Sequence, residues 1–202
     1  SERVVEASLG YFMNPLMNVF LGVVFLGEAL RKAQWLAVTF AAAGVLWLTI
    51  SLNAFPWVSL TLAISFALYG LIRKVAPASP LQGLSVETSV LLIPAVAFVL
   101  LRGNASENLT SDTATVILIL LSGAVTGIPL LLFASSAKRI PLSILGILQY
   151  ITPTIQFLLG VFAYNETFDS NRLIGYSIIW SGLVIFALDS FRFASSQTSH
   201  VE

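Results

Sequence analysis

Two long apolar stretches of the chain carry amide side chains, which can bind a polar solute through hydrogen bonds. In the first stretch Asn14 and Asn18 share one helix face with Tyr11 and Pro15, because these positions recur every three or four residues. Burying an amide in hydrocarbon without a partner is costly, so this face should point into a helix bundle. The second stretch has a corresponding face, formed by Gln149, Thr152, Pro153 and Gln156. The two faces are candidates for the lining of a ligand cavity.

The same residues have structural explanations, and both interpretations stay open. Asn18 and Gln156 could instead bond neighbouring helices, an interaction worth roughly 0.6 kcal/mol each in membranes. Pro15 and Pro153 each remove one intrahelical hydrogen bond, which could serve a gating kink or packing alone. Three tyrosines could supply aromatic walls or hydroxyl donors to a ligand, and would equally suit a protein core: Tyr11, Tyr69 and Tyr150.

Two acidic residues are candidates for proton coupling. Glu87 lies about one and a half turns into an apolar stretch, where an acid is costly and indicates function by default. Glu6 lies in the first turn of its helix, where the positive helix end would stabilise it in any case. The chain has no cysteine, and its one histidine, His200, lies in a polar tail. We therefore expect no metal site and no cofactor.

The first stretch recurs later in the chain. A shift of 138 positions (153 minus 15) aligns a proline, two glycines and an acid without a gap: Pro15 with Pro153, Gly22 with Gly160, Glu28 with Glu166 and Gly44 with Gly182. Four such residues in register over about thirty positions indicate an internal duplication. The paired glycines are explained most simply by close packing between membrane helices.

Composition defines the class of protein. Of the 202 residues 57% are hydrophobic and only 10% are charged, against about 25% charged in a soluble domain. The mean hydropathy is +0.90. Such a composition predicts an all-α integral membrane protein with the lipid bilayer as its solvent. The zero net charge gives no indication of a nucleic-acid partner. Both a monomer and a homodimer remain open.

Seven apolar segments are each close to the roughly 20 residues that a membrane span needs. The predicted spans are 7–27, 33–52, 56–73, 82–101, 114–134, 141–164 and 171–190. Counting basic residues on alternate sides predicts the orientation. One side holds Arg31, Lys32, Arg73, Lys74, Lys138, Arg139 and Arg192, and the other holds Arg3, Arg102 and Arg172. The first side is therefore expected to be cytoplasmic, together with the C-terminus.

An odd number of crossings separates the first span from its copy, the sixth, so the duplication should be inverted. Inverted repeats are typical of secondary transporters, whose sites lie near the membrane midplane between the repeats. The second repeat would occupy 56–191, the last two helices of the first repeat would occupy 1–55, and 192–202 would form a cytoplasmic tail. Three further helices are expected before the present numbering, which gives a bundle of ten helices in two units of five.

Several motifs extend this interpretation. They are EASLGYFMNPL at 6–16, FLGE at 25–28, QWLAV at 34–38, FALYGLIRK at 66–74, ET at 87–88 and QYITPT at 149–154. With them the chain resembles the EamA group of the drug/metabolite transporter superfamily, and within it the RarD-type proteins. The resemblance implies a multi-pass carrier of small molecules in the inner membrane that works by alternating access, and it leaves the substrate open.

Three other classes of protein compete with a carrier. An enzyme is not expected, because an intramembrane hydrolase needs paired acids or a Ser/His or metal set within the bilayer. A heptahelical retinal protein needs a lysine within its last span, whereas the three lysines fall in loops. A channel-like or non-transporting membrane protein remains the alternative, although no repeated filter-like loop is present.

Overall fold

The computed structural model describes residues 2–51, 55–101, 113–162 and 170–198. In these ranges every element of secondary structure is an α-helix, which confirms the all-α prediction. The chain forms two compact units, one made of residues 1–71 and 140–202 and the other of residues 72–139. The helices are α1 (Glu2–Leu26), α2 (Lys32–Ser51), α3 (Trp57–Val75), α4 (Pro80–Leu101), α6 (Thr113–Arg139), α7 (Leu142–Leu148), α8 (Ile151–Phe162) and α9 (Ser170–Thr198).

Six helical segments in the described part are long and apolar enough to cross a membrane. They correspond to the second to seventh predicted spans, and the first span corresponds to the shorter apolar stretch Gly10–Leu26 of α1. The chain is thus a multi-span membrane protein. The sixth span differs from expectation, because it consists of α7 and α8 with two turn residues between them.

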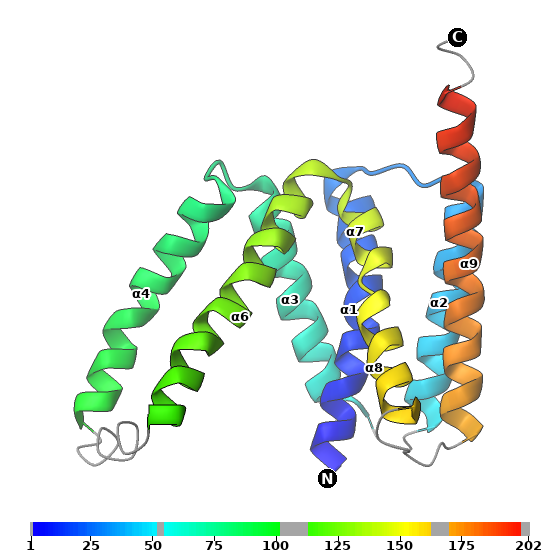
Figure 1. Ribbon diagram of the computed structural model, residues 1–202. Coiled ribbons are helices and arrows are strands. Elements are labelled where there is room, and N and C mark those ends of the chain that lie inside the picture. Colours follow the sequence, from blue (N-terminus) through cyan, green and yellow to red (C-terminus); the bar gives the residue numbers. More distant parts are fainter. Residues whose placement is uncertain (1, 52–54, 102–112, 163–169, 199–202) are drawn as a thin grey trace. The chain divides into compact units, whose positions relative to one another are not determined.

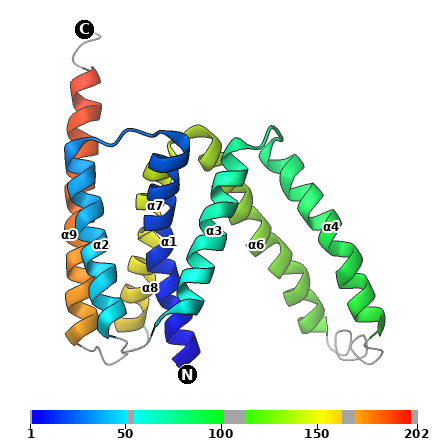
Figure 2. The same ribbon diagram turned by 180° about the vertical axis from the view of Figure 1, so that it is seen from behind.

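In the first unit two pairs of helices lie side by side, α1 with α7 and α2 with α9, and both views show them (Figures 1 and 2). Within each pair the chain directions are opposite, as the colour order from blue to red shows. Buried apolar residues from all four helices and from α3 form the core of this unit, including Phe12, Val45, Ala63, Ile147 and Ile179.

Small residues bring α2 and α9 into close contact. A Cβ atom added to Gly44 would lie 2.8 Å from the carbonyl oxygen of Gly175, and one added to Gly182 would lie 2.7 Å from that of Ala37. These separations are too short for any larger side chain, so the packing role expected for these residues is confirmed. At one end of the pair Arg31 and Asp189 form an ion pair at 2.5 Å.

In the second unit, lysines join the end of α3 to the end of α6. The Lys74 ammonium donates to the carbonyl oxygen of Ala137 at 3.1 Å, and that of Lys138 donates to the carbonyls of Ala76, at 2.7 Å, and Ala78. The free carbonyls at a helix C-terminus carry a partial negative charge, so each lysine stabilises the end of the other helix. Lys74 and Lys138 belong to the side expected to be cytoplasmic, and these contacts give both lysines a structural role.

Candidate functional site

The candidate site in the first unit begins at the interruption between α7 and α8. Proline has no N–H, so Pro153 cannot donate to the carbonyl of Gln149 as a regular helix requires. That carbonyl accepts the N–H of Thr152 instead, at 3.1 Å, and the N–H of Tyr150 donates back only three residues, to Ile147 at 3.2 Å. The chain therefore makes a tight turn at Gln149 and Tyr150, in the middle of a membrane span.

Three amide side chains join this turn to α1, and we call them the amide cluster. Asn14 Nδ2 donates to Gln149 Oε1 at 3.2 Å, and Asn18 Nδ2 donates to the same oxygen at 2.6 Å. The two helices can approach here because residue 146 is glycine. A Cβ on Gly146 would lie 2.6 Å from the carbonyl oxygen of Pro15 and 2.9 Å from the Cβ of Asn18. One amide oxygen of α7–α8 thus holds two donors of α1.

The amide cluster contains two buried acceptors without donors. Within the described part of the chain, neither Asn14 Oδ1 nor Asn18 Oδ1 has a hydrogen-bond partner, and both atoms are buried. The whole of Asn18 is 0% exposed. A buried polar atom left unsatisfied costs about 1–3 kcal/mol. Since most buried polar atoms in proteins are satisfied, each such exception needs a physical explanation, for example an ordered water.

A cavity of about 380 Å³ lies beside the amide cluster. Asn14 and Gln149 contribute polar groups to its wall, and Tyr11 and Phe66 contribute aromatic rings. The remaining lining residues are Gly10, Leu62, Thr152 and Pro153. A pocket that is mostly apolar, with a few convergent polar groups, is the usual form of a small-molecule site.

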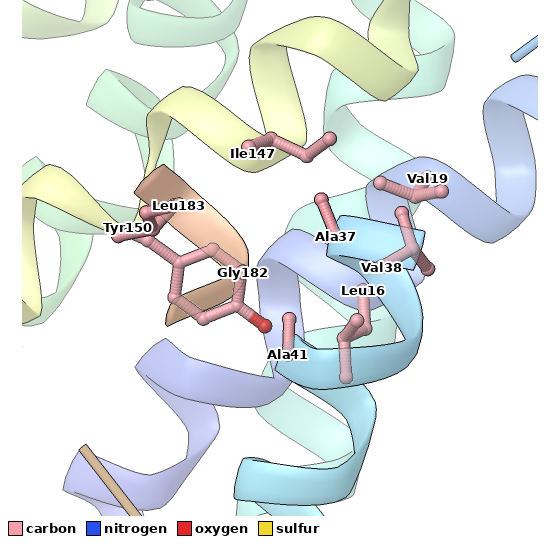
Figure 3. A pocket seen from close by; sticks show the side chains of 9 residues that line it. All are labelled: Leu16, Val19, Ala37, Val38, Ala41, Ile147, Tyr150, Gly182 and Leu183. Atoms are coloured by element: carbon pink, nitrogen blue, oxygen red, sulfur yellow. The ribbon is translucent and has the colours of Figure 1, made fainter. Parts of the chain in front are cut away.

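A second, much smaller cavity lies in the core of the same unit and is not a ligand site. Its volume of about 10 Å³ is at the lower limit for a single water molecule. Figure 3 shows the nine residues around it, all apolar except for the hydroxyl of Tyr150. That hydroxyl donates to the carbonyl of Phe12 at 3.1 Å. Tyr150 therefore belongs to the packed core and fixes α7–α8 against α1.

The structure brings some of the predicted site residues together and leaves others apart. Around the large cavity are Tyr11, Asn14, Gln149 and Pro153, and Asn18 lies one helical turn further along α1. Gln156 is exposed on α8, and Asn18 bonds to Gln149 rather than to it. Tyr69 is half-buried and does not contribute to this lining. Sequence reasoning did not single out Leu62 and Phe66, because apolar residues of α3 carry no signal beyond hydropathy.

The carboxylate of Glu28, in the loop after α1, caps α7. It accepts the backbone N–H groups of Leu142 at 2.6 Å and Ser143 at 2.8 Å, and the hydroxyl of Ser143 at 2.7 Å. Gly27, with a φ of 64°, ends α1 just before it. A carboxylate at a helix N-terminus satisfies free N–H groups and the positive helix end. The loop after α1 therefore fixes where α7 begins.

The candidate coupling residue Glu87 belongs to the second unit. Its Oε2 lies 2.8 Å from Arg73 Nη2, and the Arg73 side chain is 5% exposed whereas that of Glu87 is 41% exposed. The acid thus faces a buried cation from the last turns of α3. The side chain of Glu6 lies outside the described residues. In the described ranges, no group of three or more His, Cys, Asp or Glu side chains could hold a metal ion.

These features describe a multi-span membrane protein with an interrupted span beside a cavity of about 380 Å³. Comparison with known protein families identifies the class of membrane protein more closely. Residues 55–188 match the EamA-like transporter family, and the chain belongs to that family.

Three related proteins agree with the assignment to this family. The chain is 44% identical over its full length to "Protein RarD" of Streptomyces exfoliatus, covering 65% of that protein. It is 42% identical to "Uncharacterized transporter YojE" of Bacillus subtilis, over 98% of this chain and 66% of the relative. Identity to "Protein RarD" of Escherichia coli is 40%, over 94% and 65%. The chain thus spans just under two thirds of the length of these relatives. No solved structure matches it.

Proposed function

We propose that the chain is part of a secondary transporter that moves a small molecule across the inner membrane by alternating access, with its route beside the amide cluster. The observation that carries this proposal is the interrupted span, held to α1 by one amide oxygen at the edge of a cavity of about 380 Å³. Discontinuous helices at the membrane midplane are characteristic of substrate sites in transporters. A hinge at Gln149 and Tyr150 would let α8 move relative to α7.

We also propose that the chain is part of a ten-helix transporter built from two inverted repeats. The contacts between α2 and α9 support this proposal. Under the shift of 138 positions, Ala37 and Gly44 of α2 correspond to Gly175 and Gly182 of α9. Gly44 meets Gly175, and Gly182 meets Ala37, so the contact recurs with the two copies exchanged. A two-fold relation requires this kind of pairing. The opposite directions of α2 and α9 agree with it (Figure 2).

A further part of the proposal is that proton movement drives transport through Glu87. The 2.8 Å pair with Arg73 supplies the physical basis, because protonation of the carboxyl would cancel one of two opposite charges. The Arg73 side chain is 5% exposed, so weakening its contact with a carboxylate changes the energy of its surroundings. Protonation would therefore favour a different arrangement around Arg73, which is what coupling requires. In this proposal the C-terminus and the lysine-rich helix ends face the cytoplasm.

The test is transport by the full protein in proteoliposomes, with a panel of labelled solutes and an imposed proton gradient. We expect Gln149→Leu to lower the initial rate by at least about tenfold, since it removes the acceptor for two buried donors. Gln156→Leu, on the exposed face of α8, should stay within about twofold. Glu87→Gln should abolish uphill accumulation and keep downhill exchange. Equal rates for the two glutamine variants would refute the proposed route, and retained uphill transport by Glu87→Gln would refute the coupling role.

A further inference from the structure

We propose that the second unit binds an anionic phospholipid in a cavity between the start of α4 and the end of α6, which we call the helix-end cavity. This inference goes beyond the proposed transport function and does not depend on it. Three observations carry it: two basic side chains in the cavity wall, the absence of an acid from the described lining, and the extent of the wall along a membrane-spanning helix.

The helix-end cavity belongs to the second unit alone. The helices α4 and α6 lie side by side and run in opposite directions, so the start of α4 and the end of α6 are neighbours (Figure 1). The volume of the cavity is about 530 Å³. Its lining residues are Ser79, Pro80, Leu81, Leu131, Ser135, Lys138 and Arg139.

Two basic side chains supply the attraction for a phosphate. Lys138 Nζ donates to two backbone carbonyls, but these are uncharged groups, so the ammonium keeps its full charge and a third N–H. Arg139 is exposed, and within the described part of the chain its guanidinium forms no hydrogen bond or ion pair. The planar fork of a guanidinium matches two oxygens of a phosphate. Of the described lining residues none is acidic, so an anion meets no repulsion from a carboxylate there.

The attraction does not rest on the free N–H groups at the start of α4. The N–H of Gln82 donates to Ser79 Oγ at 3.3 Å, and that of Gly83 donates to the carbonyl of Ser79 at 2.9 Å. Pro80 has no N–H to offer. The hydroxyls of Ser79 and Ser135 add neutral donors to the wall, since a hydroxyl that accepts a hydrogen bond can still donate one.

The extent of the cavity favours a lipid over a free phosphate. Leu131 and Arg139 both line it and lie eight positions apart on α6 (139 minus 131), which is about 12 Å along the helix axis. Arg139 is the last residue of this membrane-spanning helix. The wall therefore runs from the end of the span, where headgroups lie, into its apolar part. At the start of α4, Leu81 is 63% exposed and extends the apolar edge. A ligand with a charged head and an apolar chain fits both parts.

The expected orientation selects an anionic lipid. Lys138 and Arg139 belong to the side with the excess of basic residues, which is expected to be cytoplasmic. The cytoplasmic leaflet carries anionic lipids, and basic pockets between membrane helices on that side bind their headgroups. A zwitterionic lipid brings a cation of its own close to the same two side chains and should bind less well.

The experiment is native mass spectrometry of the full protein, released from detergent micelles. Phosphatidylglycerol and phosphatidylcholine with identical acyl chains are titrated, and the dissociation constant of the first bound lipid is measured for each. We expect the constant for phosphatidylglycerol to be at least about fivefold lower. This ratio corresponds to about 1 kcal/mol, the attraction of one basic residue near a membrane surface. The headgroup without chains, glycerophosphoglycerol, should not displace the bound lipid at equal concentration.

Two arginine variants assign the preference to the helix-end cavity. Arg139→Gln removes the guanidinium from the wall and should reduce the preference for phosphatidylglycerol to within about twofold. Since Arg139 is exposed and forms no bond within the described part of the chain, this variant should fold as the parent does. Arg192→Gln is the matched control. It removes the same charge from an exposed position of α9 on the same expected side, and does not alter the cavity wall, so the preference should stay unchanged.

Three results would overturn the inference, and none of them bears on the proposed transport route. Equal dissociation constants for the two lipids in the parent protein would show that no headgroup is selected. An equal loss of preference in both arginine variants, or in neither, would show that the helix-end cavity is not the site. Displacement of phosphatidylglycerol by glycerophosphoglycerol at equal concentration would show a site for a free phosphate ester, in which the acyl chains have no part.

Discussion

The helix α1 and the pair α7–α8 carry prolines 138 positions apart, Pro15 and Pro153, yet only α7–α8 is interrupted. Pro15 lies inside a continuous helix from Glu2 to Leu26. Pro153 follows a two-residue turn that ends α7. A missing N–H is therefore not sufficient to break a membrane helix, which agrees with the tolerance of such helices for proline. The difference must come from what surrounds each proline.

Contacts with neighbouring segments distinguish the two regions. The start of α7 is held by the carboxylate of Glu28, and its last residues are followed by Gln149, which is held by two asparagines of α1. Tyr150, in the turn itself, is 1% exposed and bonded to α1 as well. The turn is thus fixed from both sides by groups on or next to α1. The contacts that hold the turn in place are therefore formed with α1 and with the loop after it, whereas Pro15 lies within a continuous helix.

The largest expected effect on the free energy of unfolding comes from removing the cap of α7. Glu28→Ala takes away three hydrogen bonds to a carboxylate, two from backbone N–H groups and one from the Ser143 hydroxyl. We expect the free energy of unfolding to fall by about 3 kcal/mol. The measurement is denaturant unfolding of the purified protein in detergent micelles.

Glu28→Gln is the control, since its amide oxygen can still accept one of these bonds, and it should cost about 1 kcal/mol. An alanine variant as stable as the parent would remove Glu28 as an anchor of the turn. The interruption would then depend on Pro153 and the amide cluster alone.

The sequence predicts the helices well, because a membrane span has a strong compositional signal and its length is set by the bilayer. It also predicts the small residues between α2 and α9, because Gly44 and Gly182 stand out as glycines 138 positions apart in two similar apolar stretches. It does not predict that Asn18 meets Gln149. Periodicity tells which residues share a helix face, but not how two helices are turned relative to each other. Likewise, the sequence does not predict that Glu28 caps α7, because that helix begins 114 positions later.

A smaller effect is expected from breaking the amide cluster, and a double-mutant cycle measures it. Asn18→Leu and Gln149→Leu should show a coupling energy of about 1.5 kcal/mol, near the upper end for hydrogen bonds between membrane helices, because the bond is 2.6 Å long and Asn18 is wholly buried. Unfolding in detergent gives the four stabilities.

The matched control cycle pairs Asn18→Leu with Gln156→Leu, and its coupling should be close to zero. Coupling of similar size in both cycles would mean that Asn18 interacts with α8 as strongly as with the turn. The hydrogen bond between Asn18 and Gln149 would then not be specific to the turn. It could no longer explain why α7–α8 is interrupted and α1 is not.

The smallest expected effect on stability concerns the hydroxyl of Tyr150, which joins α7–α8 to α1. Tyr150 donates to the carbonyl of Phe12, its own counterpart 138 positions earlier. Tyr150→Phe leaves the packed ring in place and removes only this bond. The carbonyl of Phe12 can keep its bond within α1, so the loss should be about 0.6 kcal/mol in unfolding free energy. Tyr11→Phe, at an exposed ring on the same face of α1 as Asn14, is the control and should change stability by less than about 0.3 kcal/mol.

If Tyr150→Phe were as stable as the parent but opened the turn to hydrogen exchange at Thr152, the hydroxyl would act on the hinge rather than on the fold. If neither stability nor exchange changed, Tyr150 would serve packing only, and the turn would be held by the amide cluster and Glu28.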